Sequence, residues 1–488
     1  MRNLLGAVGL CGLLAAVSCN SSDDVTSDPG ASGGQGGGSP NGGAGGSSAG
    51  MPATGGTTPS QAGTAGTGAT AGGNAGGSAG VAGELGTAGE GGSVSSDVSG
   101  TLLYGDGIPV SATAIEIGGT IVVTDSAGGF TVPDVAPQYD AYVINAPTQE
   151  VFIYSGLSTR SPTFMLYGSL PNNRTANLNG QIKGGAGFPN PTGHKLIMGA
   201  DAAPYMYDLG SAAPAGPGFQ FADMAWQGPA TLQLNVSALQ FSVNTSGLPL
   251  GYDGQANAQM TVMDGQTVGK TDGSTAATNL TLTPVTTRTL TGAISPVSDC
   301  KLTTEVYTNA GTILSDAPST QSYSYLLPTA LARDYLTIFG SCKFKLEDAE
   351  STKQAFTTAG IGSGNTLDLT LPTPPELSLP VQDATGVTSS TPFRWAAGSD
   401  PLTYTQFQTP SWTIYRIGLS SGTTFPDLSR FGIAFPKATT VTWQVTSVGV
   451  SGGTGTPEDF FATFEFPVPA DSFMSFGSSE TWSFTTSP

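Results

Sequence analysis

The four cysteines are the residues of this 488-residue chain whose chemistry is easiest to assign. Cys11 lies inside an apolar leader at the N-terminus, and Cys19 directly follows that leader. Cys300 and Cys342 are then the one pair in the rest of the chain. In a chain with an export leader, a single remaining pair predicts a disulfide, with two buried free thiols as the alternative. A disulfide that closes a loop of this length stabilises the folded state by about 4 kcal/mol.

The leader has the features of a signal peptide. Arg2 supplies a positive charge, and the apolar run Leu4–Val17 is shorter than the ~20 residues that a membrane-spanning helix needs. The leader ends in Ala16-Val17-Ser18-Cys19, which resembles a bacterial lipobox. The resemblance implies that residues 1–18 are removed and that Cys19 carries lipid, such as palmitate, at the mature N-terminus. An ordinary signal peptide cut near Ser18 is the alternative.

The residues after Cys19 indicate where the chain is held. Asn20 stands where an aspartate would retain a lipoprotein in the inner membrane, which favours the outer membrane, and Asp23 with Asp24 favours display on the cell surface. The Gly/Ala/Ser/Thr-rich tract within residues 19–96 has too few apolar side chains to fold. A coil of about 75 residues spans about 45–50 Å on average. We therefore predict a lipid-anchored bacterial outer-membrane protein with a disordered tether.

Groups that could support catalysis are sparse. The single histidine, His194, excludes metal sites built from several histidines and is predicted to lie on a surface turn. Gly418-Leu-Ser-Ser-Gly422 matches the G-x-S-x-G pattern of hydrolases, but that chemistry needs a strand–turn–helix and a later Asp and His. No helix is expected there, and His194 lies upstream. The sequence therefore predicts a protein that is not an enzyme, with no catalytic residue, no metal and no cofactor.

Paired carboxylates occur in three places: Asp23-Asp24, Glu347–Glu350 and Glu458-Asp459. A glycosidase needs two carboxyl groups that face each other across a cleft, and nothing in the spacing places these pairs so. Calcium between modules is an alternative, although the chain has no calcium-binding D-x-D-x-D-G loop. Its candidate ligands would be Asp106, Asp125 and Asp134.

Aromatic side chains are better candidates for a binding surface, because exposed apolar patches mark contact sites. Phe473 and Phe476 lie in a stretch that is predicted to be a loop, and Trp412 or Phe473 could form a platform for a sugar ring. Core packing is the alternative role for most of the aromatic residues. The further candidates are Tyr205, Tyr207, Trp226, Phe460, Phe461, Phe464 and Phe466.

Composition limits both the fold and the partners. The chain has 70 Gly and 34 Pro, and only 10% of its residues are charged, which disfavours helical surfaces. Thr, Val, Tyr and Phe between turn residues predict an all-β fold of tandem β-sandwich modules. The net charge of −19 argues against nucleic acid as a partner, because phosphate must be neutralised by Lys and Arg. The same charge disfavours direct adsorption to anionic lipid headgroups.

The first predicted module covers residues 97–171. Asp125 and the following glycines form a predicted hairpin turn between short strands. Three stretches, Ser99-Gly100-Thr101, Gly107-Ile-Pro-Val110 and Thr124–Phe130, together resemble the carboxypeptidase regulatory-like family of small prealbumin-like β-sandwiches. The resemblance implies an accessory module of exported proteins that carries no catalytic residues of its own.

Two later segments repeat the start of that module. Arg174–Ile182 and Arg288–Ile294 both place a glycine within an apolar alternation, as Gly100 is placed in the first module. The repeat predicts two further β-sandwich modules, one over residues 172–286 and one, with the disulfide, over residues 287–373.

A different pattern follows a proline-rich linker. Residues 374–488 contain alternating strands that place Trp395, Trp443 and Trp482 on inward faces. This segment resembles a fibronectin type III or immunoglobulin-like module. Together these features predict a non-catalytic surface lipoprotein that acts in adhesion or protein interaction, with an unknown protein or glycan as ligand. A carbohydrate-binding surface protein and a structural envelope stalk are the alternatives.

Overall fold

The computed structural model describes residues 96–104, 107–166, 173–202, 207–212, 216–226, 228–295, 300–329, 331, 336–346, 349–462 and 468–488. The predicted all-β class is confirmed, because strands dominate these residues. Their helical segments are the four-residue α2 (Asp459–Ala462) and the 3₁₀ turns η1 (Ala276–Thr278) and η2 (Ser429–Phe431). None of these described helices is long and apolar enough to span a membrane. The predicted signal peptide, Cys19 and the tether up to Ser95 lie outside the described residues.

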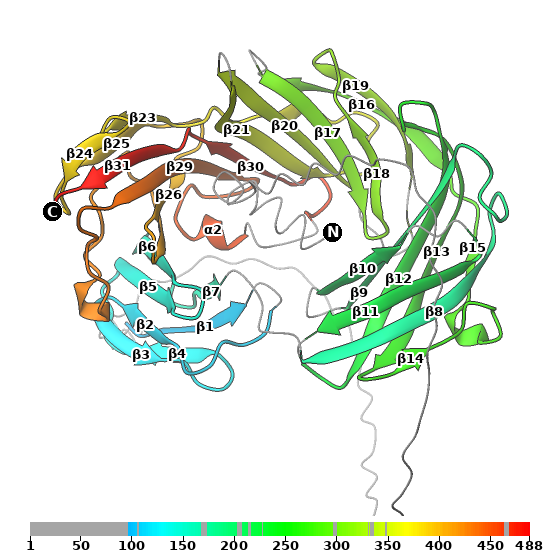
Figure 1. Cartoon of the computed structure of the whole chain (residues 1–488), viewed down its shortest axis with the longest axis horizontal. Helices are drawn as coiled ribbons and strands as arrows, with labels where there is room; N and C mark the ends of the chain where they lie inside the picture. The colour runs from blue at the N-terminus through cyan, green and yellow to red at the C-terminus, as the bar shows by residue number, and fades with distance from the viewer. Residues whose placement is uncertain are drawn as a thin grey trace, which may run out of the picture. The chain divides into compact units, whose positions relative to one another are not determined.

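Residues 98–166 form two sheets around a shared core. In one sheet, β1 pairs antiparallel with β4 and parallel with β7. The other strands, β2, β3, β5 and β6, lie at one end of a long sheet (Figure 1). Side chains alternate along β1, so that Val98 and Leu102 are fully buried while Ser99 lies on the opposite, exposed face. The bounds are β1 (Val98–Tyr104), β2 (Ala114–Ile117), β3 (Thr120–Val123), β4 (Gly129–Val132), β5 (Tyr139–Asn145), β6 (Glu150–Leu157) and β7 (Thr163–Leu166).

The pairing of β1 with one antiparallel and one parallel neighbour recurs twice along the chain. β8 pairs antiparallel with β11 and parallel with β14 and β15. β16 pairs antiparallel with β19 and parallel with β22. The bounds are β8 (Arg174–Gly184), β11 (Gly218–Trp226), β14 (Thr267–Val268), β15 (Leu280–Leu282), β16 (Thr287–Ser295), β19 (Ser322–Pro328) and β22 (Leu369–Thr370).

A glycine in each of these three strands explains the repeat in the sequence. Gly100, Gly180 and Gly292 each stand directly opposite an aromatic residue of the antiparallel neighbour. A Cβ atom at any of the three would overlap both that aromatic side chain and a backbone carbonyl on the other side. Only glycine therefore lets the ring lie across the strand. The three aromatic partners are Phe130, Phe219 and Tyr323.

The remaining strands belong to other sheets of residues 172–488. In residues 172–286 the order is β10-β9-β12-β13, and a separate sheet near the C-terminus has the order β23-β25-β28. The bounds are β9 (His194–Ala202), β10 (Tyr207–Ala212), β12 (Thr231–Val243), β13 (Pro249–Met263), β17 (Cys300–Thr308), β18 (Gly311–Asp316), β20 (Thr337–Leu346), β21 (Ala349–Gly360), β23 (Glu376–Leu379), β24 (Ala384–Val387), β25 (Phe393–Ala396), β26 (Leu402–Gln408), β27 (Thr413–Gly418), β28 (Gly422–Thr423), β29 (Thr440–Val450), β30 (Phe473–Ser478) and β31 (Trp482–Thr486).

One 14-stranded sheet crosses the predicted module boundaries. Its main path runs β18-β17-β20-β21-β30-β29-β26-β27-β6-β5-β2-β3. β21 pairs antiparallel with β30, and β27 pairs parallel with β6. Strands of the predicted modules 97–171, 287–373 and 374–488 thus share hydrogen bonds. Strand pairing therefore continues across the predicted module boundaries. The boundaries themselves stay predictions.

Two polar contacts accompany the pairing of β6 with β27. Arg430 on η2 binds both carboxylate oxygens of Glu116 on β2, at 2.5 and 2.9 Å, and its guanidinium lies 4.4 Å from the centre of the Tyr142 ring. The Glu116 side chain is only 6% exposed, so its half of this ion pair is buried. Glu458 accepts hydrogen bonds from the backbone of Ser158 and Thr159. The first and last predicted modules therefore meet through strands, an ion pair and a capped turn.

The aromatic core of the C-terminal region follows the period-2 prediction. Trp395 and Trp443 are buried, as predicted, and Trp482 is partly buried against the same cluster. The G-x-S-x-G segment also lies as predicted: Gly418 ends β27, and Gly422 begins β28 rather than a helix. No nucleophile elbow forms at this place.

Candidate binding site

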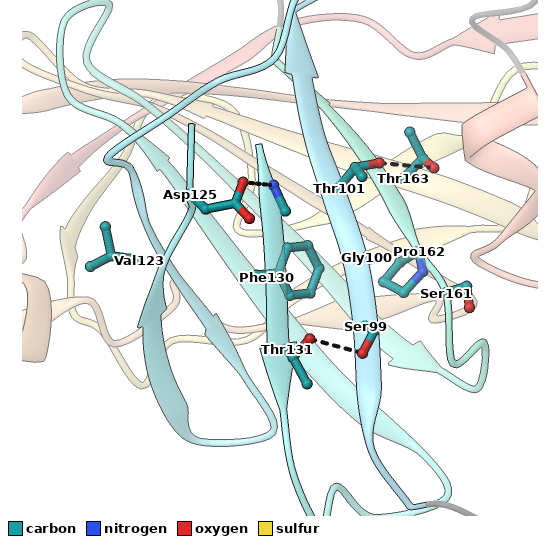
Figure 2. A pocket seen from close by; sticks show the side chains of 11 residues that line it. Ser99, Gly100, Thr101, Val123, Asp125, Phe130, Thr131, Ser161, Pro162 and Thr163 are labelled. Carbon is teal, nitrogen blue, oxygen red and sulfur yellow. Dashed lines mark hydrogen bonds between the residues drawn. The ribbon is translucent and has the colours of Figure 1, made fainter. Parts of the chain in front are cut away.

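A concavity lies on the outer face of β4-β1-β7. It has a volume of about 590 Å³ and is open to solvent on a broad side. Figure 2 shows the side chains that line it. Its lining comes from β1, β4, the start of β7 and the end of β3. The lining residues are Ser99, Gly100, Thr101, Val123, Asp125, Gly129, Phe130, Thr131, Ser161, Pro162 and Thr163. We call this concavity the hydroxyl hollow.

Strand alternation produces the hydroxyl row of the hollow. The hydroxyls of Ser99 and Thr131 lie 2.9 Å apart, and Thr101 donates to the Thr163 hydroxyl at 3.4 Å, as the dashed lines in Figure 2 show. Each hydroxyl can donate once and accept twice, so these pairs leave capacity for a ligand. The hollow therefore presents a polar surface built from three strands.

The floor of the hollow is fixed by Gly100. The Phe130 ring and the Pro162 carbonyl both occupy the space that a Cβ atom at this position would need. The Thr101 amide donates to the same carbonyl at 3.0 Å, which ties the approach of β7 to β1. The Phe130 ring is held from below by Phe164, with the ring centres 5.8 Å apart. Buried aromatic packing thus supports the strands that carry the hydroxyl row.

Asp125 is the one ionisable residue among those that line the hollow. Its Oδ1 atom accepts hydrogen bonds from the amides of Ala127 and Gly129, at 2.8 and 2.7 Å, and so caps the predicted hairpin turn. Since no Lys or Arg belongs to this lining, the hollow favours neutral or cationic groups over anions. The hydroxyls of the hollow can both donate and accept hydrogen bonds.

The three aromatic binding candidates do not form one surface. Phe473 is 45% exposed at the start of β30, so it keeps a free face. The prediction that Phe476 lies in an exposed loop is wrong: it is buried in β30 and stacks on Phe356, with ring centres 4.8 Å apart. Strand alternation places these two phenylalanines, three residues apart, on opposite faces. Trp412 is partly buried against the C-terminal aromatic core.

Most of the other aromatic candidates pack in cores. Trp226 is fully buried and donates from its indole nitrogen to the Pro229 carbonyl. Phe460 is buried on α2. Tyr205, Phe464 and Phe466 lie outside the described residues, as do the side chains of Tyr207 and Phe461.

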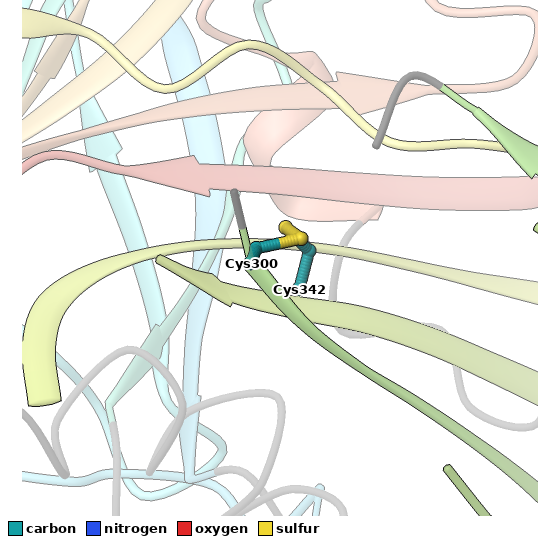
Figure 3. Close-up of a disulfide and its surroundings, with 2 residues drawn as sticks. All are labelled: Cys300 and Cys342. Carbon is teal, nitrogen blue, oxygen red and sulfur yellow. A yellow bond between two sulfur atoms is a disulfide. The ribbon is translucent and has the colours of Figure 1, made fainter. Parts of the chain in front are cut away.

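The predicted disulfide is confirmed. Cys300 on β17 is bonded to Cys342 on β20, with Cα atoms 5.5 Å apart (Figure 3). The two cysteines are not directly opposite each other in the register of the strands. Cys300 is opposite Phe344, and Cys342 is opposite Leu302, so the disulfide joins positions two residues apart along the ladder. The bond joins two neighbouring strands, so its role is structural. Cys19 lies outside the described residues, and its lipidation stays a prediction.

The titratable candidates act as structural partners. His194 starts β9 rather than lying on a free turn, and its Nδ1 atom is 2.7 Å from the Asp253 carboxylate. Asp459 is the first residue of α2, and its carboxylate accepts hydrogen bonds from the backbone of Thr454 and Gly455 in the preceding loop. No cluster of metal-binding side chains occurs in the part of the chain that the structure describes.

Two of the three calcium candidates can be located. Asp125 caps its hairpin, and Asp134 accepts a hydrogen bond from Ser96 at 3.0 Å. Asp106 lies outside the described residues, as do Glu347 and the side chain of Glu350.

Burial and charge shift several pKa values near the contact of first and last modules. Burial raises the pKa of Tyr139 to about 12, with a smaller contribution from the Glu458 carboxylate, so its hydroxyl stays protonated and donates to the Thr159 carbonyl at 2.6 Å. Burial works to raise the pKa of Glu458, but hydrogen bonds from Ser158 and Thr159 outweigh it and lower that pKa. Burial raises the pKa of Glu150 at the start of β6.

Sequence reasoning missed the hydroxyl hollow. The signal was present, because Ser99, Thr101, Thr131 and Thr163 occupy alternate, outward positions of short strands. Such residues are also common on any solvated strand, so the pattern identifies a site only after the strands are brought together.

Comparisons with known proteins give the chain no family. No model of a known protein family matches it, and no curated protein matches it. The resemblances to carboxypeptidase regulatory-like and fibronectin type III modules therefore stay predictions. Among solved structures, the four N-terminal immunoglobulin domains of Dscam1 isoform 4.44 match at 9% identity over 80% of this chain and 96% of that chain, with a TM-score of 0.13.

Two other solved structures match at the same level. A streptococcal ancillary pilin has 8% identity over 56% of this chain and 99% of that chain, with a TM-score of 0.12. A leucine-rich repeat protein from Bacteroides thetaiotaomicron has 12% identity over 38% of this chain and 27% of that chain, with a TM-score of 0.14. TM-scores this low carry no conclusion about function, so the description of the fold depends on the strands of this chain itself.

Proposed function

We propose that this chain is a non-catalytic cell-surface lipoprotein that acts in adhesion or protein interaction. The hydroxyl hollow is the observation that carries the proposal, because it is an open, polar surface without a nucleophile–base pair among its lining residues. A lipid on Cys19 would hold the protein at the outer membrane, and the tract after it would give the modules reach.

The chemistry of the hollow limits its ligand. Hydroxyls on three strands offer hydrogen bonds in both directions, and Val123 adds an apolar rim that is 63% exposed. Without a cation in the lining, an anionic ligand would meet only the Asp125 carboxylate. The surface therefore suits an uncharged polar segment of a protein or a neutral sugar.

Carbohydrate binding is the second candidate, and the hydroxyl row favours it. Sugars present dense hydroxyls that match a row of Ser and Thr side chains. Phe473 is half-exposed elsewhere on the chain and could stack on a sugar ring. Loss of glycan binding on Phe473→Ala would support a separate sugar platform at Phe473. Glycan binding that is unchanged in Phe473→Ala would assign the sugar to the hydroxyl hollow instead.

The test is a binding screen with the purified chain against envelope proteins and a glycan array. Thr101→Val and Thr131→Val each remove a hydroxyl of the hollow while keeping the branched shape of the side chain. We expect each to weaken binding by about fivefold, since one hydrogen bond contributes about 1 kcal/mol. Thr261→Val, on the exposed face of β13, is the matched control and should bind as the wild type does.

Three results would contradict the proposal. They are hydrolytic turnover by the purified chain, binding that ignores both substitutions in the hollow, and an unmodified Cys19 in mass spectrometry of the mature N-terminus. The last result would remove the membrane anchor and leave the binding role of the hollow in place.

A further inference from the structure

The strand β3 forms an open end of the 14-stranded sheet. It is the last strand on the path β6-β5-β2-β3 (Figure 1), and among the described residues no strand pairs with its outer edge. Two large aliphatic side chains lie on it in solvent, Ile121 with 51% and Val123 with 63% exposure. Exposed aliphatic residues on an unpaired edge make a template for another strand.

The hairpin turn decides which backbone groups point outward. Gly118 and Gly119, both with positive φ, form a two-residue turn that makes Ile117 and Thr120 a hydrogen-bonded pair. Hydrogen-bonded and non-bonded pairs alternate along an antiparallel ladder. Ile121 and Val123 are therefore the residues of β3 whose N–H and C=O groups face away from β2. The edge thus offers donors and acceptors next to the two exposed side chains.

Edge strands of natural proteins usually carry protection, and β3, although it is only four residues long, lacks the charges, proline and bulge that serve this purpose. Lysine, proline, a bulge or an inward charge would blunt such an edge. The stretch Ile117–Thr124 contains no charged residue and no proline, and β3 pairs with β2 in an unbroken register. At the opposite end of the sheet, β18 ends in Asp316.

We propose that β3 pairs antiparallel with β3 of a second copy of this chain. A two-fold axis at Val122 would set Ile121 opposite Val123 in both directions, and the outward backbone groups would form hydrogen bonds reciprocally. Val123 also lines the hydroxyl hollow, so a second copy on β3 would lie at the rim of that hollow, and dimerisation is therefore measured without any ligand.

At this edge charge opposes a second copy least. The chain has 35 acidic and 16 basic residues, so two copies repel each other at most faces. The stretch Ile117–Thr124 is neutral and brings no carboxylates together. In the proposed register Asp125 would lie opposite Gly119, so the nearest carboxylates stay several residues apart.

The test is sedimentation equilibrium of the whole chain with Ile121→Lys and Val123→Lys as variants. We expect the wild type to dimerise with a dissociation constant of up to about 100 µM. The association is weak because a short strand pair gives a small interface. Each lysine should weaken the dimer by at least about tenfold, because it places a charge against an apolar partner. Leu250→Lys, on an equally exposed aliphatic of β13, is the matched control and should leave dimerisation unchanged.

Hydrogen exchange supplies a second measurement that does not need a variant. The amides of Ile121 and Val123 should exchange more slowly as the protein concentration rises, while those of Leu250 and its neighbours should not change. Each of three results would overturn the proposal. They are a wild type that is still monomeric at about 100 µM, a dimer that both lysine variants preserve, and amide exchange at Ile121 and Val123 that does not change with protein concentration. Pairing of β3 only with a strand of another protein would overturn it as well.

Discussion

Glu458 shows how a carboxylate that could serve chemistry instead binds the backbone of the segment after β6. Its Oε1 atom accepts from the amides of Ser158 and Thr159 and from the Ser158 hydroxyl. The neighbouring Asp459 accepts in the same way from the amides of Thr454, Gly455 and Thr456, which lie in the loop before α2. From the sequence the two form a carboxylate pair, and in the structure each is used by a different segment of backbone. Spacing along the chain could not reveal this, because the partners of Glu458 lie about 300 residues earlier.

We expect Glu458→Gln to change how stability depends on pH. The folded-state pKa of Glu458 is lowered below its usual 4.5, so the charged form is favoured in the folded state. Its contribution to stability is present above that unfolded value and is lost as the pH falls towards the folded pKa. Urea unfolding between about pH 6 and pH 3 should thus show a steeper loss for the wild type than for the variant.

A matched substitution separates this effect from general acid denaturation. Glu376→Gln changes a glutamate whose side chain is 73% exposed, so it should keep the wild-type profile more closely. If the free energy of unfolding falls equally with pH in the wild type and in Glu458→Gln, the hydrogen bonds of Glu458 do not contribute to the pH dependence of stability.

At the scale of the element, the three glycine-bearing strands were partly predictable. The sequence showed Gly100, Gly180 and Gly292 within apolar alternations, and the structure gives all three the same pairing and an aromatic residue directly opposite. The aromatic partners were not predictable, because register between strands depends on the turn and the core rather than on either strand alone. For the same reason Phe476 was assigned to a loop, although Ser475 and Gly477 around it are strand residues.

Gly100→Ala, Gly180→Ala and Gly292→Ala should each destabilise the chain by about 2–4 kcal/mol, because the new methyl group overlaps a ring and a carbonyl. The measurement is urea or thermal unfolding of each variant. Gly251→Ala in β13 is the control: a Cβ there would meet its nearest atom at 3.5 Å, an ordinary contact. It should be neutral or stabilising by about 0.5 kcal/mol. Equal effects at all four sites would rule out the steric explanation.

At the scale of the whole described chain, the first and last predicted modules depend on each other. The class of fold, the inward tryptophans and the disulfide followed from composition, periodicity and cysteine count. The pairing of β6 with β27 did not, because periodicity identifies a strand but not its neighbour. The buried Val151 and Ile153 of β6 belong to the same apolar cluster as Phe407 and Trp443. The 97–171 segment therefore completes its core with residues of the C-terminal region.

A chain that ends at Thr373 should lose the native structure of β6. We expect the amides of Val151 to Tyr154 to exchange at least about 100-fold faster than in the whole chain, since both the partner strand and the apolar cover are removed. The amides of β8, which pairs within residues 172–286, serve as the internal reference. Unchanged protection of β6 in the shortened chain would show that the first module folds alone.

The ion pair between Glu116 and Arg430 also sets an order in time. A ribosome makes Glu116 first, and its partner follows only 314 residues later. At ordinary rates of synthesis that delay is about 15–60 s. Throughout it, β6 has an open edge and Glu116 lacks its partner. The first segment to be made is therefore among the last whose strand pairing and ion pair can be completed, because both partners lie in the C-terminal region.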